Sequence, residues 1–180
     1  MLGVEQIPSL DDLAMQALPG LNRWRRELVV DARGRVLEVG CGTGLMLPLY
    51  PVDAELVALD FHREPLDCAR ARGHDAAILH ASVESLPFAD ASFARVVSGL
   101  VFCSVPDPMR GLAEIRRVLK PGGRLLMLEH VHARKRFGRS VLNAIQPAWT
   151  ALAGGCHPNR ETEAIVERAG FVIESEGYRA

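Results

Sequence analysis

The 180-residue sequence lacks any apolar stretch approaching the roughly 20 residues that a membrane-spanning helix requires. Its first residues are neither basic nor followed by an apolar segment, so we expect no signal peptide. The four cysteines are scattered, without a Cys-x-x-Cys pair, which disfavours both a disulfide framework and a zinc site. Reduced thiols, a cytoplasmic location and no bound metal are therefore predicted.

The sequence also lacks a marked excess of either charge, with a formal net charge of −1 at pH 7. No global field would recruit nucleic acid, so no nucleic-acid partner is expected. With 48% hydrophobic and 24% charged residues, the composition is that of an ordinary globular protein. A chain of this length fits one domain, which we predict over residues 1–180.

Apolar strands alternate with helices along the chain, a pattern that predicts an α/β fold with a doubly wound, mostly parallel sheet and helices on both faces. We expect strands at 35–39, 55–60, 76–79, 93–98, 124–129 and 171–175. We expect helices at 21–30, 44–49, 64–72, 110–119 and 160–169, and another that begins after Ser9.

The first expected strand leads into three glycines at alternate positions, Gly40, Gly42 and Gly44. Such a turn lets the backbone approach a ligand closely, because no Cβ atoms intervene. A dinucleotide fingerprint, G-x-G-x-x-G, would need its third glycine where Leu45 stands. The second strand ends in Asp60, whose carboxylate could accept hydrogen bonds from both hydroxyls of a ribose.

Glu38 precedes the glycines, and the spacing acid-x-G-x-G-x-G resembles motif I of class I S-adenosylmethionine-dependent methyltransferases. Residues 81–93 (ASVESLPFADASF) and 116–123 (RRVLKPGG) are similar to two further motifs of the UbiE-like branch, methyltransferase type 11. The resemblance implies a Rossmann-like fold and S-adenosyl-L-methionine as the cofactor. Ser82 stands where this family usually has the Asp that meets the adenine amino group, which removes a charge from that contact.

The resemblance also implies which residues surround the cofactor. Glu38 would face its ammonium group, Asp60 its ribose, and Phe61 would pack either on the adenine or in the core. The segment after the fourth strand would lie beside the methyl group. The cofactor-binding residues expected on this basis are Glu38, Gly40, Cys41, Gly42, Thr43, Gly44, Asp60, Phe61, Ser82, Val83, Ser98 and Leu100.

Candidate catalytic bases follow the fifth strand. Glu129 and His130 stand at its carboxyl end, where open α/β sheets bind ligands, although a histidine there can also simply cap a loop. His157 belongs to the segment 154–162, which resembles G-G-C-H-x-N-R-x-T of a branch related to phospholipid, quinone and thiol methyltransferases. The plainer interpretation of this segment is a turn that caps the last helix, with Asn159 as N-cap.

Members of the resembled family usually end on two strands after the fifth, and this chain ends after the first of them. The expected sheet therefore lacks the usual last strand, and the unpaired edge of the fifth strand predicts an altered strand order or a partner chain, such as a homodimer. The basic residues of 132–139 suit peripheral contact with a membrane, but a solvated helix face is the favoured interpretation.

The sequence thus predicts S-adenosylmethionine-dependent methyl transfer to a small or lipid-like acceptor: a phospholipid amine, a quinone-like carbon or a thiol. Within one domain we expect N-terminal helices over 1–34, a cofactor-binding core over 35–130, and an acceptor-side segment with the last strand over 131–180. Two alternatives are an NAD-type oxidoreductase, which shares the glycine turn and Asp60, and a non-catalytic relative that binds the cofactor.

Overall fold

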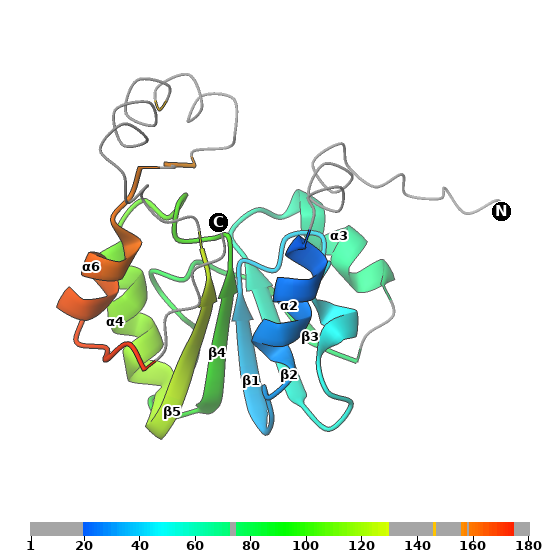
Figure 1. Ribbon diagram of the computed structural model, residues 1–180. Coiled ribbons are helices and arrows are strands. Elements are labelled where there is room, and N and C mark those ends of the chain that lie inside the picture. The colour runs from blue at the N-terminus through cyan, green and yellow to red at the C-terminus, as the bar shows by residue number, and fades with distance from the viewer. Residues whose placement is uncertain (1–19, 73–74, 130–145, 147–155, 158, 175–180) are drawn as a thin grey trace, which may run out of the picture.

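The computed structural model of the protein describes residues 20–72, 75–129, 146, 156–157 and 159–174. In this part of the chain, helices flank both faces of a five-stranded parallel sheet (Figure 1). The strands are β1 (Arg35–Val39), β2 (Glu55–Asp60), β3 (Ala77–His80), β4 (Phe93–Gly99) and β5 (Leu119–Leu128). The helices are α2 (Leu21–Val29), α3 (Glu64–Ala71), α4 (Pro108–Val118) and α6 (Thr162–Arg168), with a short 3₁₀ helix, η1 (Leu47–Leu49).

The strand order is β3-β2-β1-β4-β5. The first strand, β1, lies in the middle of the sheet. β2 and β3 follow on one side of it, and the chain then crosses back to place β4 and β5 on the other side. The connections after β1 and β4 therefore leave the sheet in opposite directions. Ligands of open α/β sheets bind at such a switch point, beyond the carboxyl ends of the strands. The predicted doubly wound, Rossmann-like architecture is confirmed.

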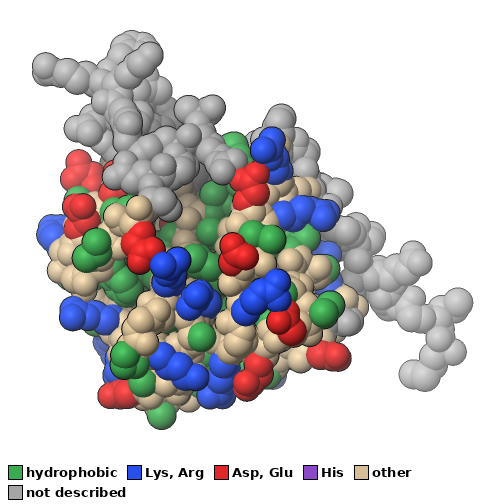
Figure 2. Space-filling view, turned by 60° about the horizontal axis from the view of Figure 1, so that its bottom comes forward, with side chains coloured by type: hydrophobic (Ala, Val, Ile, Leu, Met, Phe, Trp, Pro, Cys, Tyr) green, Lys and Arg blue, Asp and Glu red, His purple; other side chains and the backbone are tan. Residues whose placement is uncertain are grey.

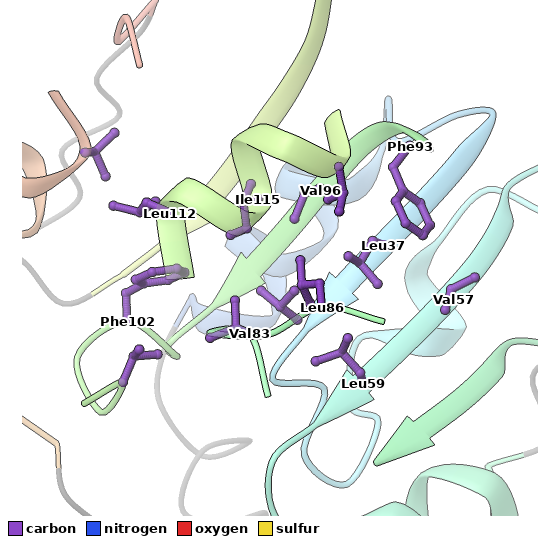
Figure 3. Packing of buried hydrophobic residues seen from close by; sticks show 14 residues of the cluster. Leu37, Val57, Leu59, Val83, Leu86, Phe93, Val96, Phe102, Leu112 and Ile115 are labelled. Atoms are coloured by element: carbon purple, nitrogen blue, oxygen red, sulfur yellow. The ribbon is translucent and has the colours of Figure 1, made fainter. Parts of the chain in front are cut away.

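One face of the sheet is covered by α4 (Figure 3). Leu112 and Ile115 of this helix are fully buried against Leu37 of β1 and Val96 of β4. Their spacing of three residues places both on one side of the helix, which is how an amphipathic helix buries its apolar stripe.

The opposite face packs against α2 and α3, and its buried strand residues include Val36 and Ala58. Side chains alternate between the two faces along a strand, so residues two positions apart point the same way. Glu38 and Asp60 follow Val36 and Ala58 by two positions. Their carboxylates therefore belong to the layer that contains α2 and α3.

Two helices differ from the prediction. The helix expected at 44–49 is reduced to η1, because Gly44 has a φ of 81°, in the left-handed region, and so cannot form the first turn of a right-handed helix. The helix expected from Arg110 begins at Pro108, because the side chain of Asp107 accepts the backbone N–H of Arg110 at 3.1 Å and caps the helix. Proline also suits the first helical position, where its missing N–H is not needed.

The fifth strand is longer than predicted. It begins at Leu119 directly after α4, so the Lys-Pro-Gly-Gly turn lies within β5 instead of before it. The register with β4 shifts between Phe93 and Arg95, where this turn bulges out of the ladder.

The strand predicted at 171–175 is not formed over residues 171–174, which corrects that prediction. The backbone N–H of Phe171 donates to the carbonyl of Val166, which ties the segment to the end of α6. Phe171 and Ile173 pack against the core through their side chains, and Glu174 pairs with Arg124 of β5 at 3.1 Å. In the described residues β5 therefore has β4 as its one strand neighbour. The helix expected after Ser9 lies outside the described residues.

The face that Figure 2 brings forward, at the amino ends of the strands, carries Lys and Arg side chains intermixed with Asp and Glu. Ion pairs at strand starts and loops include Arg35 with Glu55 at 3.2 Å and Arg33 with Asp53 at 2.8 Å. Such solvated pairs contribute little stability. None of the helices described here has the length and apolar character needed to cross a bilayer.

Candidate functional site

Two adjoining cavities lie at the carboxyl ends of the strands. The first has a volume of about 210 Å³ and the second about 400 Å³. Gly40, Gly42 and Leu100 line both cavities, so the two are adjacent, and we call them the two lobes of one site and the region of the shared residues its neck. The neck lies between the turn after β1 and the segment after β4, which is the switch point of the sheet.

The first cavity has a buried, polar floor. Glu38 is 3% exposed, and its Oε2 atom accepts no hydrogen bond from the described residues. Burial raises the pKa of Glu38 to about 8, and the nearby Tyr50 hydroxyl and Arg25 guanidinium oppose this rise without cancelling it. The lining residues are Arg25, Glu38, Gly40, Cys41, Gly42, Thr43, Leu45, Met46, Gly99 and Leu100.

The glycine turn forms the neck between the lobes. Gly40 and Gly42 have φ angles of 68° and 53°, in the left-handed region that favours glycine. A Cβ on Gly40 would lie 2.3 Å from Val101, whereas a Cβ on Gly42 would enter open space. The Gly42 position therefore leaves room for a ligand to approach the backbone. Cys41, in the same turn, is a poor nucleophile because burial raises the pKa of its thiol.

Asp60 connects this turn to the second cavity. Its Oδ2 accepts the backbone N–H of Gly42 at 2.8 Å, and its Oδ1 accepts that of His62 at 2.8 Å. A carboxylate offers about four acceptor positions, so each oxygen retains capacity for a ligand hydroxyl. Phe61 is 67% exposed at the edge of this lobe and contacts the His62 ring edge-on. The residues that line the lobe are Gly40, Gly42, Leu59, Asp60, Phe61, His62, Ala81, Ser82, Val83, Glu84, Leu100, Val101, Ser104, Val105 and Pro106.

Ser82 lines the second lobe and shapes a turn beside it. Its hydroxyl oxygen accepts the backbone N–H of Glu84 at 3.1 Å. The Glu84 carboxylate in turn accepts the N–H of Asp107 at 2.6 Å. The Ser82 hydroxyl thus accepts the backbone hydrogen bond that an Asp side chain commonly accepts in such a turn, but it carries no charge.

Glu129 holds the segment that follows β4. Its Oε1 accepts the hydroxyl of Ser98 at 2.7 Å and the backbone N–H groups of Val101 and Phe102 at 3.0 and 3.1 Å. Leu100, just before these amides, has a φ of 62° and donates its own N–H to a β5 carbonyl. Burial raises the pKa of Glu129, and these donors limit the rise. Oε1 is therefore committed to the loop that walls the second cavity, whereas Oε2 is buried and accepts no hydrogen bond from the described residues.

His157 and Arg160, from the C-terminal segment, form hydrogen bonds with the same loop. The N–H of His157 donates to the carbonyl of Cys103 at 2.8 Å, and its ring Nδ1 lies 3.3 Å from the same oxygen. Nη1 of Arg160 donates to the carbonyls of Phe102 and Val105, the latter at 2.7 Å. The segment expected to cap α6 through Asn159 thus braces the cavity wall, and α6 instead begins at Thr162 with Glu161 before it.

The structure brings most of the predicted cofactor-binding residues to this site. The cavities are lined by Glu38, Gly40, Cys41, Gly42, Thr43, Asp60, Phe61, Ser82, Val83 and Leu100. Four predicted site residues do not line them: Gly44, Ser98, Glu129 and His157. His130 lies outside the described residues. Among the residues described, no group of three His, Cys, Asp or Glu side chains could hold a metal ion.

The exceptions have separate physical reasons. Gly44 allows close approach to α3, because a Cβ there would lie 3.0 Å from the Ala69 Cα. Ser98 is fully buried and turned toward Glu129, which in turn serves the loop. The main lining residue that the sequence prediction missed is Arg25, whose position on the buried stripe of α2 was the available signal.

Residues 37–127 match the model of the methyltransferase domain family. The chain belongs to this family. Membership implies S-adenosyl-L-methionine as the cofactor, and the fold and motifs agree. The NAD-type alternative is set aside, since the relatives and the structural neighbour below are methyltransferases.

Relatives of this chain act on different acceptors, according to their names. Thiol S-methyltransferase TMT1B of Rattus norvegicus is 34% identical over 145 residues, which cover 76% of this chain and 59% of that protein. The C-methyltransferase UbiE of Desulfotalea psychrophila, of ubiquinone and menaquinone biosynthesis, is 40% identical over 180 residues, covering 83% and 72%. Phosphatidylethanolamine N-methyltransferase of Cereibacter sphaeroides is 36% identical over 115 residues, covering 60% and 57%.

A solved S-adenosylmethionine-dependent methyltransferase from Mesorhizobium loti superposes with a TM-score of 0.65 at 22% identity, covering 89% of this chain and 84% of that one. At this identity the similarity shows the fold. The chain spans 59% of the length of the thiol methyltransferase that it matches.

Proposed function

We propose that this protein transfers the methyl group of S-adenosyl-L-methionine to a small or lipid-like acceptor. The observation that carries the proposal is the two-lobed site, with the Glu38 carboxylate in one lobe and the Asp60 carboxylate in the other. The cofactor has an amino acid at one end and an adenosine at the other. A buried acid suits its ammonium group, and a carboxylate with remaining acceptor capacity suits a ribose diol.

In this proposal Glu38 binds the ammonium group and Asp60 the ribose. Phe61, Ser82 and Val83 surround the adenine, while Cys41, Thr43 and the glycines contact the cofactor through the backbone. The bound cofactor supplies an electrophilic methyl group on a sulfonium. The protein's task is to align the acceptor with that methyl group and to exclude water.

The accepting atom forms its new bond to the methyl carbon as the carbon–sulfur bond breaks, and the electron pair of that bond stays on sulfur. An acceptor that starts protonated releases its proton to a base or to solvent. A thiol needs the weakest base, because its pKa of about 8.5 leaves some thiolate at neutral pH. For an amine or a ring carbon we propose His130 or His157 as the base. The three hydrogen bonds that converge on Glu129 favour a positioning role for that residue.

The named acceptors of the relatives support a thiol, a quinone-like carbon or a phospholipid amine as the substrate class. The proposal places the protein in the cytoplasm, with peripheral membrane contact through residues 132–139 if the acceptor is a lipid. A homodimer is included in the proposal, because β5 has one strand neighbour among the described residues.

A turnover screen with methyl-labelled S-adenosylmethionine tests the function against three acceptors: an aryl thiol, phosphatidylethanolamine vesicles and a demethylated quinone. We expect label transfer to one class, lost in Glu38→Ala and Asp60→Ala and kept in Arg26→Gln, an exposed change on α2. Binding of S-adenosylhomocysteine without transfer to any acceptor would instead favour a non-catalytic relative.

A further inference from the structure

Arg25 occupies an unusual place on α2. The buried residues of this helix are Leu21, Arg25 and Val29, spaced by four, so one stripe of the helix faces the protein interior. Arginine is rarely buried to this extent, and Arg25 is 7% exposed. Arg23 and Arg26, its neighbours on the same helix, are exposed. Burying an arginine is costly unless its charge is paired, and here the guanidinium lies close enough to Glu38 to oppose the rise in the pKa of that carboxyl.

The buried side chain lines the first cavity together with Glu38. Nη1 of Arg25 donates to Oδ1 of Asn22 at 3.3 Å, which helps to orient the guanidinium group. This arginine comes from a helix outside residues 37–127, the part of the chain that matches the family model. The cavity therefore combines an acid from the shared core with a cation from an N-terminal helix.

A cation and an acid on the same small cavity match a zwitterion. The methionine end of the cofactor carries an ammonium and a carboxylate on one carbon atom. The planar fork of a guanidinium group fits a carboxylate with two parallel hydrogen bonds. Glu38 Oε2, buried and without a partner among the described residues, offers an acceptor for the ammonium.

We propose that Arg25 binds the carboxylate of the cofactor's methionine end and thereby selects ligands that carry an amino acid over simple nucleosides. This inference rests on the proposed use of S-adenosylmethionine. Beyond that proposed function, it assigns a role in ligand specificity to Arg25, which lies on a helix outside the residues that match the family model.

The test is a calorimetric comparison of two ligands that differ only in the carboxylate: S-adenosylmethionine and decarboxylated S-adenosylmethionine. Wild-type protein should bind the decarboxylated ligand about 10- to 100-fold more weakly, the range expected for hydrogen bonds to a charged group. Arg25→Gln should weaken binding of the intact cofactor by a similar factor and should change affinity for the decarboxylated ligand much less, because that ligand lacks the carboxylate and is affected by Arg25 only through the pKa of Glu38. Arg25→Lys should recover part of the lost affinity, since it keeps the charge but not the fork.

Arg26→Gln, one position along the helix and exposed, is the matched control and should bind both ligands as wild type does. Equal losses for the two ligands in Arg25→Gln would overturn the inference and assign Arg25 a structural role. So would equal binding of the two ligands by wild type, a result that stands even if the variants fold poorly. Wild-type protein that binds neither ligand would overturn the proposed cofactor use itself, and the inference with it.

Discussion

Glu129 and Ser98 join the ends of two neighbouring strands, with the serine hydroxyl donating to Glu129 Oε1 at 2.7 Å. The same oxygen accepts the N–H groups of Val101 and Phe102, which lead into the cavity wall. Glu129→Ala would leave these donors without an acceptor, at about 1–3 kcal/mol for each buried group. With three such donors, we expect the variant to lose about 3 kcal/mol or more of unfolding free energy, measured by denaturant unfolding, and to bind S-adenosylhomocysteine more weakly.

Glu129→Gln distinguishes positioning from base catalysis. The amide keeps one acceptor oxygen, so we expect a smaller stability loss and methyl transfer that keeps the pH profile of the wild type. Glu167→Ala, an exposed change on α6, is the control for stability. Loss of turnover in Glu129→Gln, with cofactor binding intact and the rise of rate with pH abolished, would show that Glu129 is a base after all.

The raised pKa of Glu38, about 8, links stability to pH. The folded protein keeps this proton up to about pH 8, whereas the unfolded chain releases it near the ordinary value of 4.5. The carboxyl therefore destabilises the folded state increasingly as pH rises between these values, by at most about 1.4 kcal/mol per pH unit. Unfolding free energies measured from pH 5 to 8 should show Glu38→Gln gaining stability relative to wild type as pH rises.

The affinity for the cofactor should depend on pH in the opposite sense to stability, because binding needs Glu38 to be ionised. An ammonium partner favours the ionised carboxylate, so wild-type affinity should rise with pH below about 8 and binding should release a proton. Glu38→Gln should bind weakly and lack this dependence. The exposed change Glu64→Gln on α3 should behave as wild type in both measurements. Parallel pH curves for wild type and Glu38→Gln would contradict the assignment.

The sheet followed from the sequence because its strands β1 and β2 are buried on both faces and read as continuous apolar runs. The predicted bounds Arg35–Val39 and Glu55–Asp60 match β1 and β2. Residues 171–174 show where such a reading fails: an apolar run predicts burial, but it does not say whether the backbone or only the side chains will dock. The backbone bond from Phe171 to Val166 belongs to a local helix-ending turn that Gly170 permits, but the ion pair of Glu174 with Arg124 is a tertiary contact without a local signal.

In the site, too, some residues could be predicted from the sequence and others only from the three-dimensional structure. Glu38, Asp60 and the glycines follow a short motif, because one strand and one turn position them. Arg25 reaches the cavity from another element: its spacing from Leu21 and Val29 indicates that it lies on the buried stripe of α2, but only the packing of α2 places it at the cavity. Glu129 was found by its place at a strand end, but its role depends on which donors converge on it, and that is a property of three-dimensional structure.

Gly42 can be tested against a glycine of similar backbone conformation elsewhere. Gly42 and Gly122 have φ angles of 53° and 76°, and a Cβ at either would meet no atom within 4 Å. Alanine at each position should therefore cost about 1–2 kcal/mol of stability through the left-handed conformation. Only Gly42→Ala adds a methyl group at the neck of the site, so only this variant should weaken S-adenosylmethionine binding, by about tenfold or more. Equal affinities of the two variants for S-adenosylmethionine would show that the cofactor does not bind next to Gly42.

Arg160 connects the C-terminal segment to the cavity wall through the carbonyls of Phe102 and Val105. Arg160→Leu removes the donors and leaves two loop carbonyls under-satisfied, so we expect about 1–3 kcal/mol of lost stability. The loop should also open more often, and the amides of residues 101–105 should exchange hydrogen faster than in wild type. Arg168→Leu is the matched control, because that exposed side chain bonds only to a carbonyl of its own helix, Ala164, among the contacts of the described residues. If hydrogen exchange in the loop is the same in both variants, the C-terminal segment does not hold the wall. If it rises only in Arg160→Leu, the wall of the second cavity, which we propose holds the adenosine end of the cofactor, depends on a segment beyond the matched family core.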